Sequence, residues 1–393
     1  TGNPAIYNDG VGTKYMVDRG IPLEEAYNWC PHGCHEPGLQ GKLYPGSLMS
    51  LNMAAAVEFA LLNGVHRKTK SRLPVPETGD PRHFKTYEEF KDAVKIQLAY
   101  LIKRGVELVQ MVEVIQQEQR QVMLASLSFE ECIEKGKDIL AGGAKYNSGP
   151  EAVIGAIADI SNSLAAVKKL IYEDKKLTWD ELLEALDNDF EGYEQIREMC
   201  LSAPKYGNDI PEVDEIATEI TRFVAEEFRK HKGLHGGKLT VHSYGSAEHL
   251  APGEQTGALP SGRRAWVPLS DAISPMQGTD TKGPTAVFKS VSKCRIDLFT
   301  SGMLLNMKLD PSLFKDEKGI GDFMSLMKSW HDLGLYQAQF NVVSPEILRE
   351  AQTNPEKYRG LLVRVSGYSA FFVDLYKEIQ DDIIARTTQG GLA

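Results

Sequence analysis

The sequence predicts an α/β fold in which a parallel sheet or barrel is ringed by helices. Apolar residues recur at helical spacing through residues 86–232, and short β-like runs between Gly/Pro turns fill residues 238–310. Helices and strands then alternate as far as the C-terminus. Helices that alternate with short buried strands are typical of a parallel sheet. The length of 393 residues permits two or three domains.

The first half of the chain is expected to be mostly helical after an opening of loops and short strands over residues 1–50. The run MAAAVEFALLN at residues 53–63 predicts a short buried helix. Apolar spacing predicts further helices over residues 86–141, 151–173, 179–200 and 211–232. Thr178 and Glu181 form a predicted capping box, and Pro211 stands in the first turn of its helix.

The second half mixes strands with helices. The runs KLTVHSY, AVFKSVSK and MLLNMKL are expected to be strands, because they are β-like and lie between Gly/Pro turns. A helix is expected near residues 320–333, a strand at 336–343 and a helix at 345–353. After Gly360 the pattern predicts a strand, a loop centred on a glycine and a final helix around residues 371–386.

Charge and composition exclude several classes of function. The chain carries 44 basic and 54 acidic side chains, and the net charge of −10 argues against nucleic acid or an anionic membrane as the main partner. No apolar run approaches the roughly 20 residues that span a bilayer. The opening Thr1-Gly2-Asn3-Pro4 has no signal-peptide character. Five scattered cysteines do not resemble a disulfide framework and favour the cytoplasm.

A glycine-centred segment near the C-terminus carries the most specific pattern, Arg-Val-Ser-Gly-Tyr-Ser-Ala-Phe-Phe at residues 364–372. A strand followed by a tight turn explains most glycines between apolar runs. This long, tightly spaced pattern, however, closely resembles the signature of glycyl radical enzymes. The resemblance implies that Gly367 stores a radical on its Cα. Glycine suits that role because it has no Cβ and permits unusual backbone geometry.

A second segment surrounds Cys34 and reads Trp-Cys-Pro-His-Gly-Cys-His-Glu-Pro-Gly at residues 29–38. Its cysteines and histidines are too compressed for a zinc site, and a radical-SAM cluster would need a cysteine where Pro37 stands. A structural thiol is the default for a lone buried cysteine. Gly-Cys-x-Glu-Pro instead resembles the active-site loop of glycyl radical dehydratases, lyases and decarboxylases. The resemblance makes Cys34 the hydrogen-abstracting thiyl and Glu36 the general base.

The resemblance covers essentially the whole chain. Cys34 and Gly367 lie 333 residues apart (367 − 34), which is typical of this family. Further similar stretches are residues 1–4, 256–263, 268–271, 274–280 and 339–343. Enzymes of this family are roughly twice as long, and this chain resembles their C-terminal half.

The resemblance refines the expected fold to half of a ten-stranded α/β barrel ringed by helices, with the Cys loop and the C-terminal Gly loop meeting at its centre. Residues 1–340 would form the second half-barrel, and residues 341–393 the C-terminal glycyl radical domain. The N-terminal half-barrel is absent from this chain. A half-barrel leaves an apolar face open, so missing N-terminal residues or a second chain would complete it.

The function implied by the resemblance is a lyase that breaks a C–O, C–N, C–S or C–C bond of a small organic substrate through a thiyl radical. Pyruvate formate-lyase itself uses two adjacent cysteines, whereas Gly33 and His35 flank Cys34 here, so its acyl transfer is not expected. An arylacetate decarboxylase or a fumarate-adding synthase is the alternative within the family. A non-catalytic scaffold subunit is the alternative outside it.

Ser47, Leu48, Met49 and His249 are the candidates for substrate binding. By the resemblance, the stretch around Ser47 replaces a substrate-binding run of glycerol and propanediol dehydratases. It is smaller and more apolar, which disfavours a simple diol. Ser47 is at least as well explained as a helix cap, and Leu48 and Met49 as core residues. His249 lies with His242 in a Gly/Pro-rich stretch, where exposed loop residues are the default.

The resemblance also implies partners. A radical-SAM activating enzyme would install the radical at Gly367 after translation, and neither an organic cofactor nor a metal is expected on this chain. A homodimer is expected from the family, in the cytoplasm or within a bacterial microcompartment.

Overall fold

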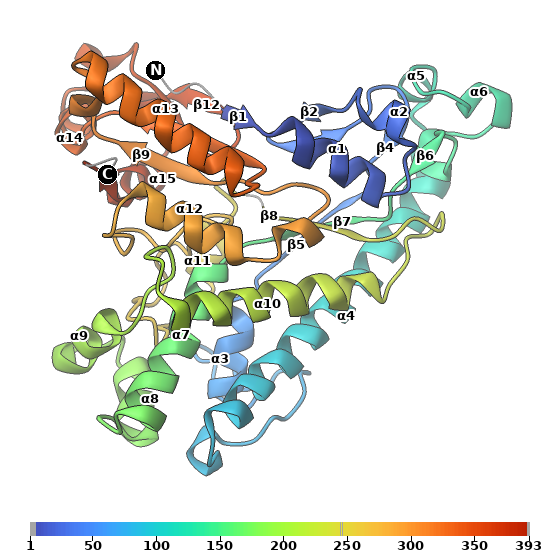
Figure 1. The fold of residues 1–393 in the computed structure, drawn as a ribbon. Coiled ribbons are helices and arrows are strands. Elements are labelled where there is room, and N and C mark those ends of the chain that lie inside the picture. Colours follow the sequence, from blue (N-terminus) through green and yellow to red (C-terminus); the bar gives the residue numbers. More distant parts are fainter. Residues whose placement is uncertain (1–4, 244, 246, 391–393) are drawn as a thin grey trace.

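The computed structural model describes residues 5–243, 245 and 247–390, and it confirms the predicted α/β class (Figure 1). The predicted family stretch Thr1-Gly2-Asn3-Pro4 lies outside the described residues. Strands form the centre of the molecule, and helices of very different lengths surround them.

Two sheets make up that centre. The first has the order β5–β7–β8 and is parallel, with strands Leu48–Leu51, Glu151–Ile154 and Thr240–Ser243. The second has the order β1–β10–β9–β13, with strands Ala5–Tyr7, Gln337–Val342, Asn306–Leu309 and Thr388–Gln389. β1 runs antiparallel to β10, whereas β9 is parallel to both β10 and β13. A parallel bridge between Ser243 and Met303 connects the two sheets.

Three two-stranded sheets complete the β structure. They pair β2 with β3 (Cys30–His32 and Glu36–Gly38), β4 with β6 (Leu43–Tyr44 and Tyr146–Asn147), and β11 with β12 (Leu362–Arg364 and Ser369–Phe371). The first and last of these are antiparallel hairpins that contain the two predicted motifs.

The helices cover the sheets from several sides (Figure 1). They are α1 (Asp9–Asp18), α2 (Leu23–Ala26), α3 (Ala55–Leu61), α4 (Tyr87–Gln119), α5 (Met123–Ser126), α6 (Cys132–Lys135), α7 (Ile157–Val167), α8 (Trp179–Asp187), α9 (Glu194–Ser202), α10 (Pro211–Arg229), α11 (Leu250–Glu254), α12 (Pro284–Lys293), α13 (Glu317–Asp332), α14 (Pro345–Thr353) and α15 (Lys377–Ala385). α4 packs against β5 and α3, and α7 packs against α10. None of the helices in the described ranges is both long and apolar enough to cross a membrane.

Several predicted helix boundaries are confirmed. Thr178 and Glu181 form the complete capping box at the start of α8. Pro211 is the first residue of α10, where its missing N–H costs nothing. α14 spans the predicted residues 345–353.

Two predicted elements are of the wrong type. Residues 151–154, predicted as the start of a helix, form β7, a strand flanked by parallel neighbours and buried throughout. A strand buried on both faces has the same continuous apolar pattern as a buried helix. The run AVFKSVSK, predicted as a strand, lies in α12, whose first residue is Pro284. There the helical spacing of Val287, Phe288 and Val291 prevails over their β propensity.

Other boundaries also differ from the prediction. α1 forms within a segment predicted to contain only loops and strands, because the Asn8 side chain caps the amide of Val11. The helix predicted over residues 179–200 is two helices, separated where Asp189 and Phe190 adopt positive φ. The final helix begins only at Lys377, after β12.

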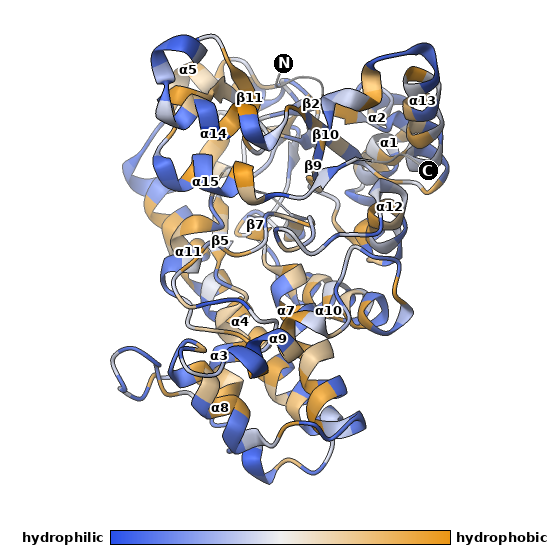
Figure 2. Ribbon diagram, turned by 90° about the vertical axis from the view of Figure 1, so that its left-hand side faces the viewer, coloured by the Kyte–Doolittle hydropathy of each residue, from blue (hydrophilic) through white to orange (hydrophobic). Residues whose placement is uncertain are grey.

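Within the described residues, the buried apolar side chains form one large cluster, a separate C-terminal cluster and a small cluster around Cys132, Ile139 and Ala144. The C-terminal cluster contains Val343, Leu348, Ala351, Val363, Val365, Phe372 and Ile383. Figure 2 shows hydrophobic residues concentrated along α7 and α4, whereas α14 and α15 present hydrophilic stretches. The C-terminal segment that carries the Gly loop therefore packs around its own small core.

Candidate active site

The Cys loop is the tip of the β2–β3 hairpin. His32 and Glu36 are cross-strand partners, so residues 33–35 form the turn between them. Gly33 has a φ of +59°, and a Cβ at this position would lie 2.7 Å from Oε2 of Glu36. Glycine is therefore required for the turn and for the approach of the Glu36 carboxylate.

The carboxylate of Glu36 holds the amide side of this loop. Its Oε2 accepts hydrogen bonds from the backbone N–H groups of Cys34 and His35, each at 2.9 Å. The Glu36 residue is 7% exposed. In this arrangement the Glu36 side chain holds the Cys loop in place, and Glu36 follows Cys34 by two positions in the sequence.

The Gly loop is the tip of the β11–β12 hairpin. Arg364 and Ser369 are its last cross-strand partners, and the amide of Val365 donates to the carbonyl oxygen of Tyr368 at 2.9 Å. Gly367 has a φ of +83°, and its N–H donates to Oε1 of Gln339 at 3.2 Å. This hydrogen bond anchors the tip of the Gly loop to strand β10.

The two loops meet tip to tip. A Cβ built on Gly367 would lie 2.2 Å from Cβ of Cys34 and 2.7 Å from its Sγ. Both distances are far shorter than any real contact of a Cβ atom, so the Cys34 side chain occupies the space beside the Cα of Gly367. Two residues 333 positions apart in sequence (367 − 34) are thus in direct contact. A hydrogen atom can pass between them without a large movement.

A polar network supports the Gly loop from behind. Oγ of Ser366 donates to Asp271 at 3.0 Å, and Nδ2 of Asn306 donates to Oγ of Ser366 at 3.2 Å. Nη1 of Arg386 donates to the carbonyl oxygen of Val365 at 2.8 Å. The two residues that precede Gly367 are therefore tied to the body of the protein.

Comparison with known proteins agrees with this geometry. The family model "Pyruvate formate lyase-like" matches residues 1–253, and the model "Glycine radical" matches residues 269–373. The chain belongs to the glycyl radical enzyme family.

Individual relatives give the same assignment. The chain is 39% identical to trans-4-hydroxy-L-proline dehydratase of Clostridioides difficile and 35% identical to isethionate sulfite-lyase of Bilophila wadsworthia, covering 99% and 98% of this chain. It covers only 49% and 47% of those relatives, so it spans about half the length of the curated relatives it matches.

Solved structures match with the same coverage. The glycerol-bound B12-independent glycerol dehydratase of Clostridium butyricum superposes with a TM-score of 0.94 at 39% identity. The substrate-bound hydroxyproline dehydratase of C. difficile superposes with a TM-score of 0.95 at 38% identity. Each comparison covers 99% of this chain and 49% of the solved chain.

Three of the four predicted substrate-binding residues, Ser47, Leu48 and Met49, lie on or just before β5, and their side chains point to different faces of its sheet. Oγ of Ser47 donates to the side chain of Gln116 on α4, at 3.1 Å. Met49 is buried against the same helix, with its Sδ at the position a Gly105 side chain would need. The structure thus places Ser47 and Met49 against α4.

Leu48 points to the opposite face of the sheet. It pairs in register with Glu151, which pairs with Thr240, and paired residues share a face. His242 follows on that face, and its ring stacks on the ring of His35 in the Cys loop with centroids 5.5 Å apart. Leu48, 59% exposed, therefore lies on the face that the Cys loop contacts.

The two histidines of the Gly/Pro-rich stretch are buried, contrary to the expectation of exposed loop residues. Burial lowers the pKa of His242, and that of His35, to about 3, so both stacked rings are neutral near pH 7. His249 lies behind the Gly loop, with Nε2 3.1 Å from Asp382 and Nδ1 3.5 Å from Asp271.

Sequence reasoning missed two tyrosines at the Cys loop. Oη of Tyr7 donates to the carbonyl oxygen of Cys34 at 3.1 Å, and Oη of Tyr336 donates to that of His35 at 2.7 Å. A lone tyrosine before or within a strand has no spacing that marks it. Gln339, in contrast, stands in a stretch that already resembled the family.

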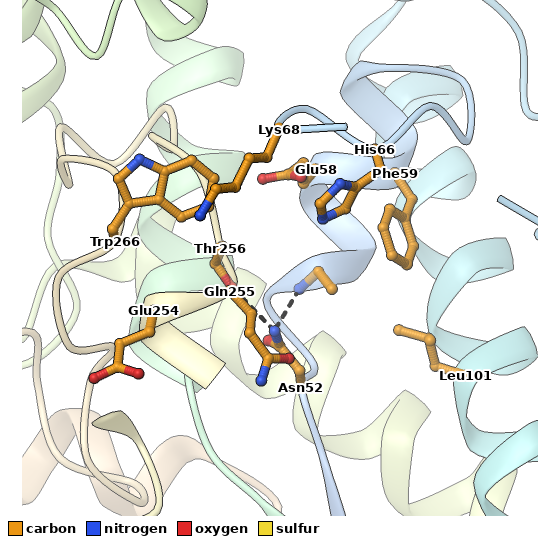
Figure 3. Close-up of a pocket in the computed structure, with 11 residues that line it drawn as sticks. Asn52, Glu58, Phe59, His66, Lys68, Leu101, Glu254, Gln255, Thr256 and Trp266 are labelled. Atoms are coloured by element: carbon orange, nitrogen blue, oxygen red, sulfur yellow. Dashed lines mark hydrogen bonds between the residues drawn. The ribbon is translucent and has the colours of Figure 1, made fainter. Parts of the chain in front are cut away.

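A pocket of about 370 Å³, shown in Figure 3, is lined by no residue of the Cys loop or the Gly loop. Its lining includes Asn52, Glu58, His66, Lys68, Gln255 and Trp266, and contains none of the predicted site residues. The candidate chemistry therefore lies where the hairpins meet and not in this pocket.

Proposed function

We propose that this chain is the catalytic half of a glycyl radical lyase that breaks a C–O, C–N, C–S or C–C bond of a small organic substrate. The observation that carries the proposal is the direct contact between Cys34 and Gly367. Relatives named as dehydratases and as a sulfite-lyase support this type of reaction.

A separate protein starts the proposed reaction. A radical-SAM activating enzyme removes one hydrogen atom from Cα of Gly367, which leaves a glycyl radical. That radical takes the hydrogen atom from Sγ of Cys34 and leaves a thiyl radical, which takes a hydrogen atom from the substrate. A bond of the substrate radical then breaks while Glu36 accepts or supplies a proton. The product radical takes a hydrogen atom from Cys34, and the resulting thiyl radical takes a hydrogen atom from Cα of Gly367, which restores the glycyl radical.

The proposed architecture is half of a ten-stranded barrel. The bridge between Ser243 and Met303 links β5, β7 and β8 to β9 and β10, which supports a five-stranded half. We assign residues 1–340 to this half-barrel and residues 341–393 to a glycyl radical domain, supported by the separate C-terminal cluster. The other half-barrel would come from further N-terminal residues or a second chain. Homodimerisation remains a prediction.

The proposed substrate site lies on the face of the β5–β7–β8 sheet that meets the Cys loop. Leu48 is its best-placed candidate, because it is exposed on that face. The missing half would close the site and exclude water from the radical intermediates.

Variants of the complete, activated enzyme test the proposal. Cys34→Ala is expected to retain the Gly367 radical and lose all turnover of a substrate panel of hydroxy acids, amino alcohols, hydroxysulfonates and arylacetates. Glu36→Gln is expected to lower kcat by about 10²–10⁴-fold, the usual range for a general base. Cys30→Ala, a matched control in the same hairpin, should keep full turnover. Full turnover by Cys34→Ala would contradict the proposed function.

A further inference from the structure

The proposed role of Glu36 as a proton-transfer group affects the hydrogen bonds by which it holds the Cys loop. Its Oε2 accepts the N–H groups of both Cys34 and His35. If the carboxylate rotates so that Oε2 turns toward a substrate, it releases both amides. The loop that presents Cys34 would then lose its restraint at the moment when the sulfur must stay beside Gly367.

The carbonyl side of the same loop has an independent restraint. The hydroxyls of Tyr7 and Tyr336 donate to consecutive carbonyl oxygens, those of Cys34 and His35. The peptide units around the radical cysteine are thus held by Glu36 from one side and by two phenols from the other. Burial is the largest influence on the pKa of each phenol and raises it, so both remain protonated donors.

The two tyrosines are themselves firmly placed. Tyr7 ends β1 and pairs with Gln337 at the start of β10, and Tyr336 immediately precedes that strand. Their rings touch edge to face with centroids 5.8 Å apart. Tyr336 also packs against Tyr15 and Trp29, at 5.1 and 5.9 Å.

Gly302 leaves the space into which the rings of Tyr336 and His35 fit. Gly302 has a φ of +97°, and a Cβ there would lie 2.9 Å from the Tyr336 ring and 2.9 Å from the His35 ring. The close approach of Tyr336 to the Cys loop therefore depends on the absence of a side chain at residue 302.

We propose that Tyr7 and Tyr336 are positioning residues that hold the Cys34 loop by its carbonyl groups while Glu36 releases the loop amides to act on substrate. The inference rests on the proposed function. Neither phenol takes part in bond breaking; each acts through the position of Cys34. They keep the sulfur in contact with Gly367 throughout the catalytic cycle.

Hydrogen exchange at the radical measures that contact without substrate. The hydrogen remaining on Cα of Gly367 splits the radical signal in electron paramagnetic resonance into a doublet. Transfer to and from the Cys34 thiol, which exchanges with D₂O, replaces this hydrogen by deuterium, and the doublet collapses. The collapse rate therefore reports how well Cys34 is placed against Gly367.

The test compares Tyr7→Phe, Tyr336→Phe and the double variant in the complete, activated enzyme. Loss of one hydrogen bond should slow the collapse about fivefold, and the double variant about 25-fold, at an unchanged radical yield. Tyr15→Phe is the matched control. It lies in the same aromatic cluster, but its hydroxyl donates to the carbonyl oxygen of Ile296 at 2.7 Å and not to the Cys loop. The doublet of Tyr15→Phe should collapse at the wild-type rate.

A second arm repeats the comparison in a Glu36→Ala background. With the amide side of the loop already released, each tyrosine substitution should slow the collapse more than it does in the wild type. Collapse at the wild-type rate in both tyrosine variants, or equal slowing in Tyr15→Phe, would overturn the inference. A wild-type enzyme that forms no doublet would instead refute the proposed function, so the two failures are distinguishable.

Discussion

Two constraints of unequal size require a glycine at position 367. Its φ of +83° would cost another residue about 1–2 kcal/mol. A Cβ would also lie 2.2 Å from Cβ of Cys34 and 3.2 Å from its Cα, atoms that cannot move without the loop. The closeness to Cys34 is therefore the larger constraint, and it follows from the chemistry proposed for the pair.

Gly367→Ala tests this at the residue scale. We expect no radical signal after anaerobic activation, together with a lower melting temperature from the displaced Cys loop. Gly360→Ala is the matched control, because residue 360 lies in the same segment with nothing within 4 Å of an added Cβ. It should give the wild-type radical yield. A radical of normal yield in Gly367→Ala would contradict the assignment.

The residues proposed to carry the chemistry stand in recognisable sequence patterns, whereas those proposed to position them do not. Cys34, Glu36 and Gly367 stand in short patterns whose spacing is tightly constrained. Tyr7 and Tyr336 act through single hydroxyl groups on backbone carbonyls, and any buried tyrosine near a strand has the same sequence pattern. Their role depends on contacts between segments roughly 300 residues apart, which one sequence does not reveal.

At the scale of elements, two hairpins present their tips to one another, and charged side chains secure the second hairpin. His249, at the start of α11, lies between Asp271 and Asp382, and Asp382 belongs to α15. Arg386 joins Asp382 at 2.8 Å and holds the carbonyl oxygen of Val365. The network ties the Gly loop to two helices.

This network predicts a pH dependence of stability. Burial alone lowers the pKa of His249, but Asp382 and Asp271 outweigh it, so its pKa is raised. Its stabilising contribution is complete below the ordinary histidine pKa near 6.5 and is lost as pH rises through the raised value. For Asp382, burial raises the pKa, but His249 and Arg386 outweigh this effect and lower it. Its contribution is present above pH of about 4 and is lost in acid.

We expect His249→Gln to destabilise the protein by about 3 kcal/mol near pH 6, because it leaves Asp382 with one partner fewer in a buried site. The difference from wild type should shrink as pH rises toward 9. Melting temperatures across this range, from calorimetry of the complete enzyme, measure it. His331→Gln, whose side chain is 69% exposed, is the control and should show no such trend. A difference that grows with pH would contradict the assigned ion pairs.

Element types were predictable where one face of the element is exposed. The amphipathic α10 and α14 match their predicted positions, because their buried residues recur at helical spacing. β7 was predicted as a helix because it is buried on both faces, and α12 was predicted as a strand because Val287, Phe288 and Val291 give it a β-like composition between Gly/Pro turns. Burial from both sides, which depends on tertiary neighbours, removes the periodic signal.

At the scale of the whole molecule, the described residues leave strand edges and an apolar side chain open to further pairing. Within the described residues, β5 and β1 each have a strand neighbour on one side only. Leu48 on β5 is exposed on the face that meets the Cys loop. Open strand edges and exposed apolar residues favour pairing with further chain, in agreement with relatives about twice as long.

The central claim is that Gly367 stores a radical that Cys34 uses. Its most direct test is electron paramagnetic resonance of the anaerobically activated, complete enzyme, followed by mass spectrometry after exposure to air. We predict a doublet and cleavage of the backbone at Gly367. If an activating enzyme that works on a known relative leaves Gly367 without a signal and uncleaved, the claim is wrong, and the scaffold alternative becomes the better description.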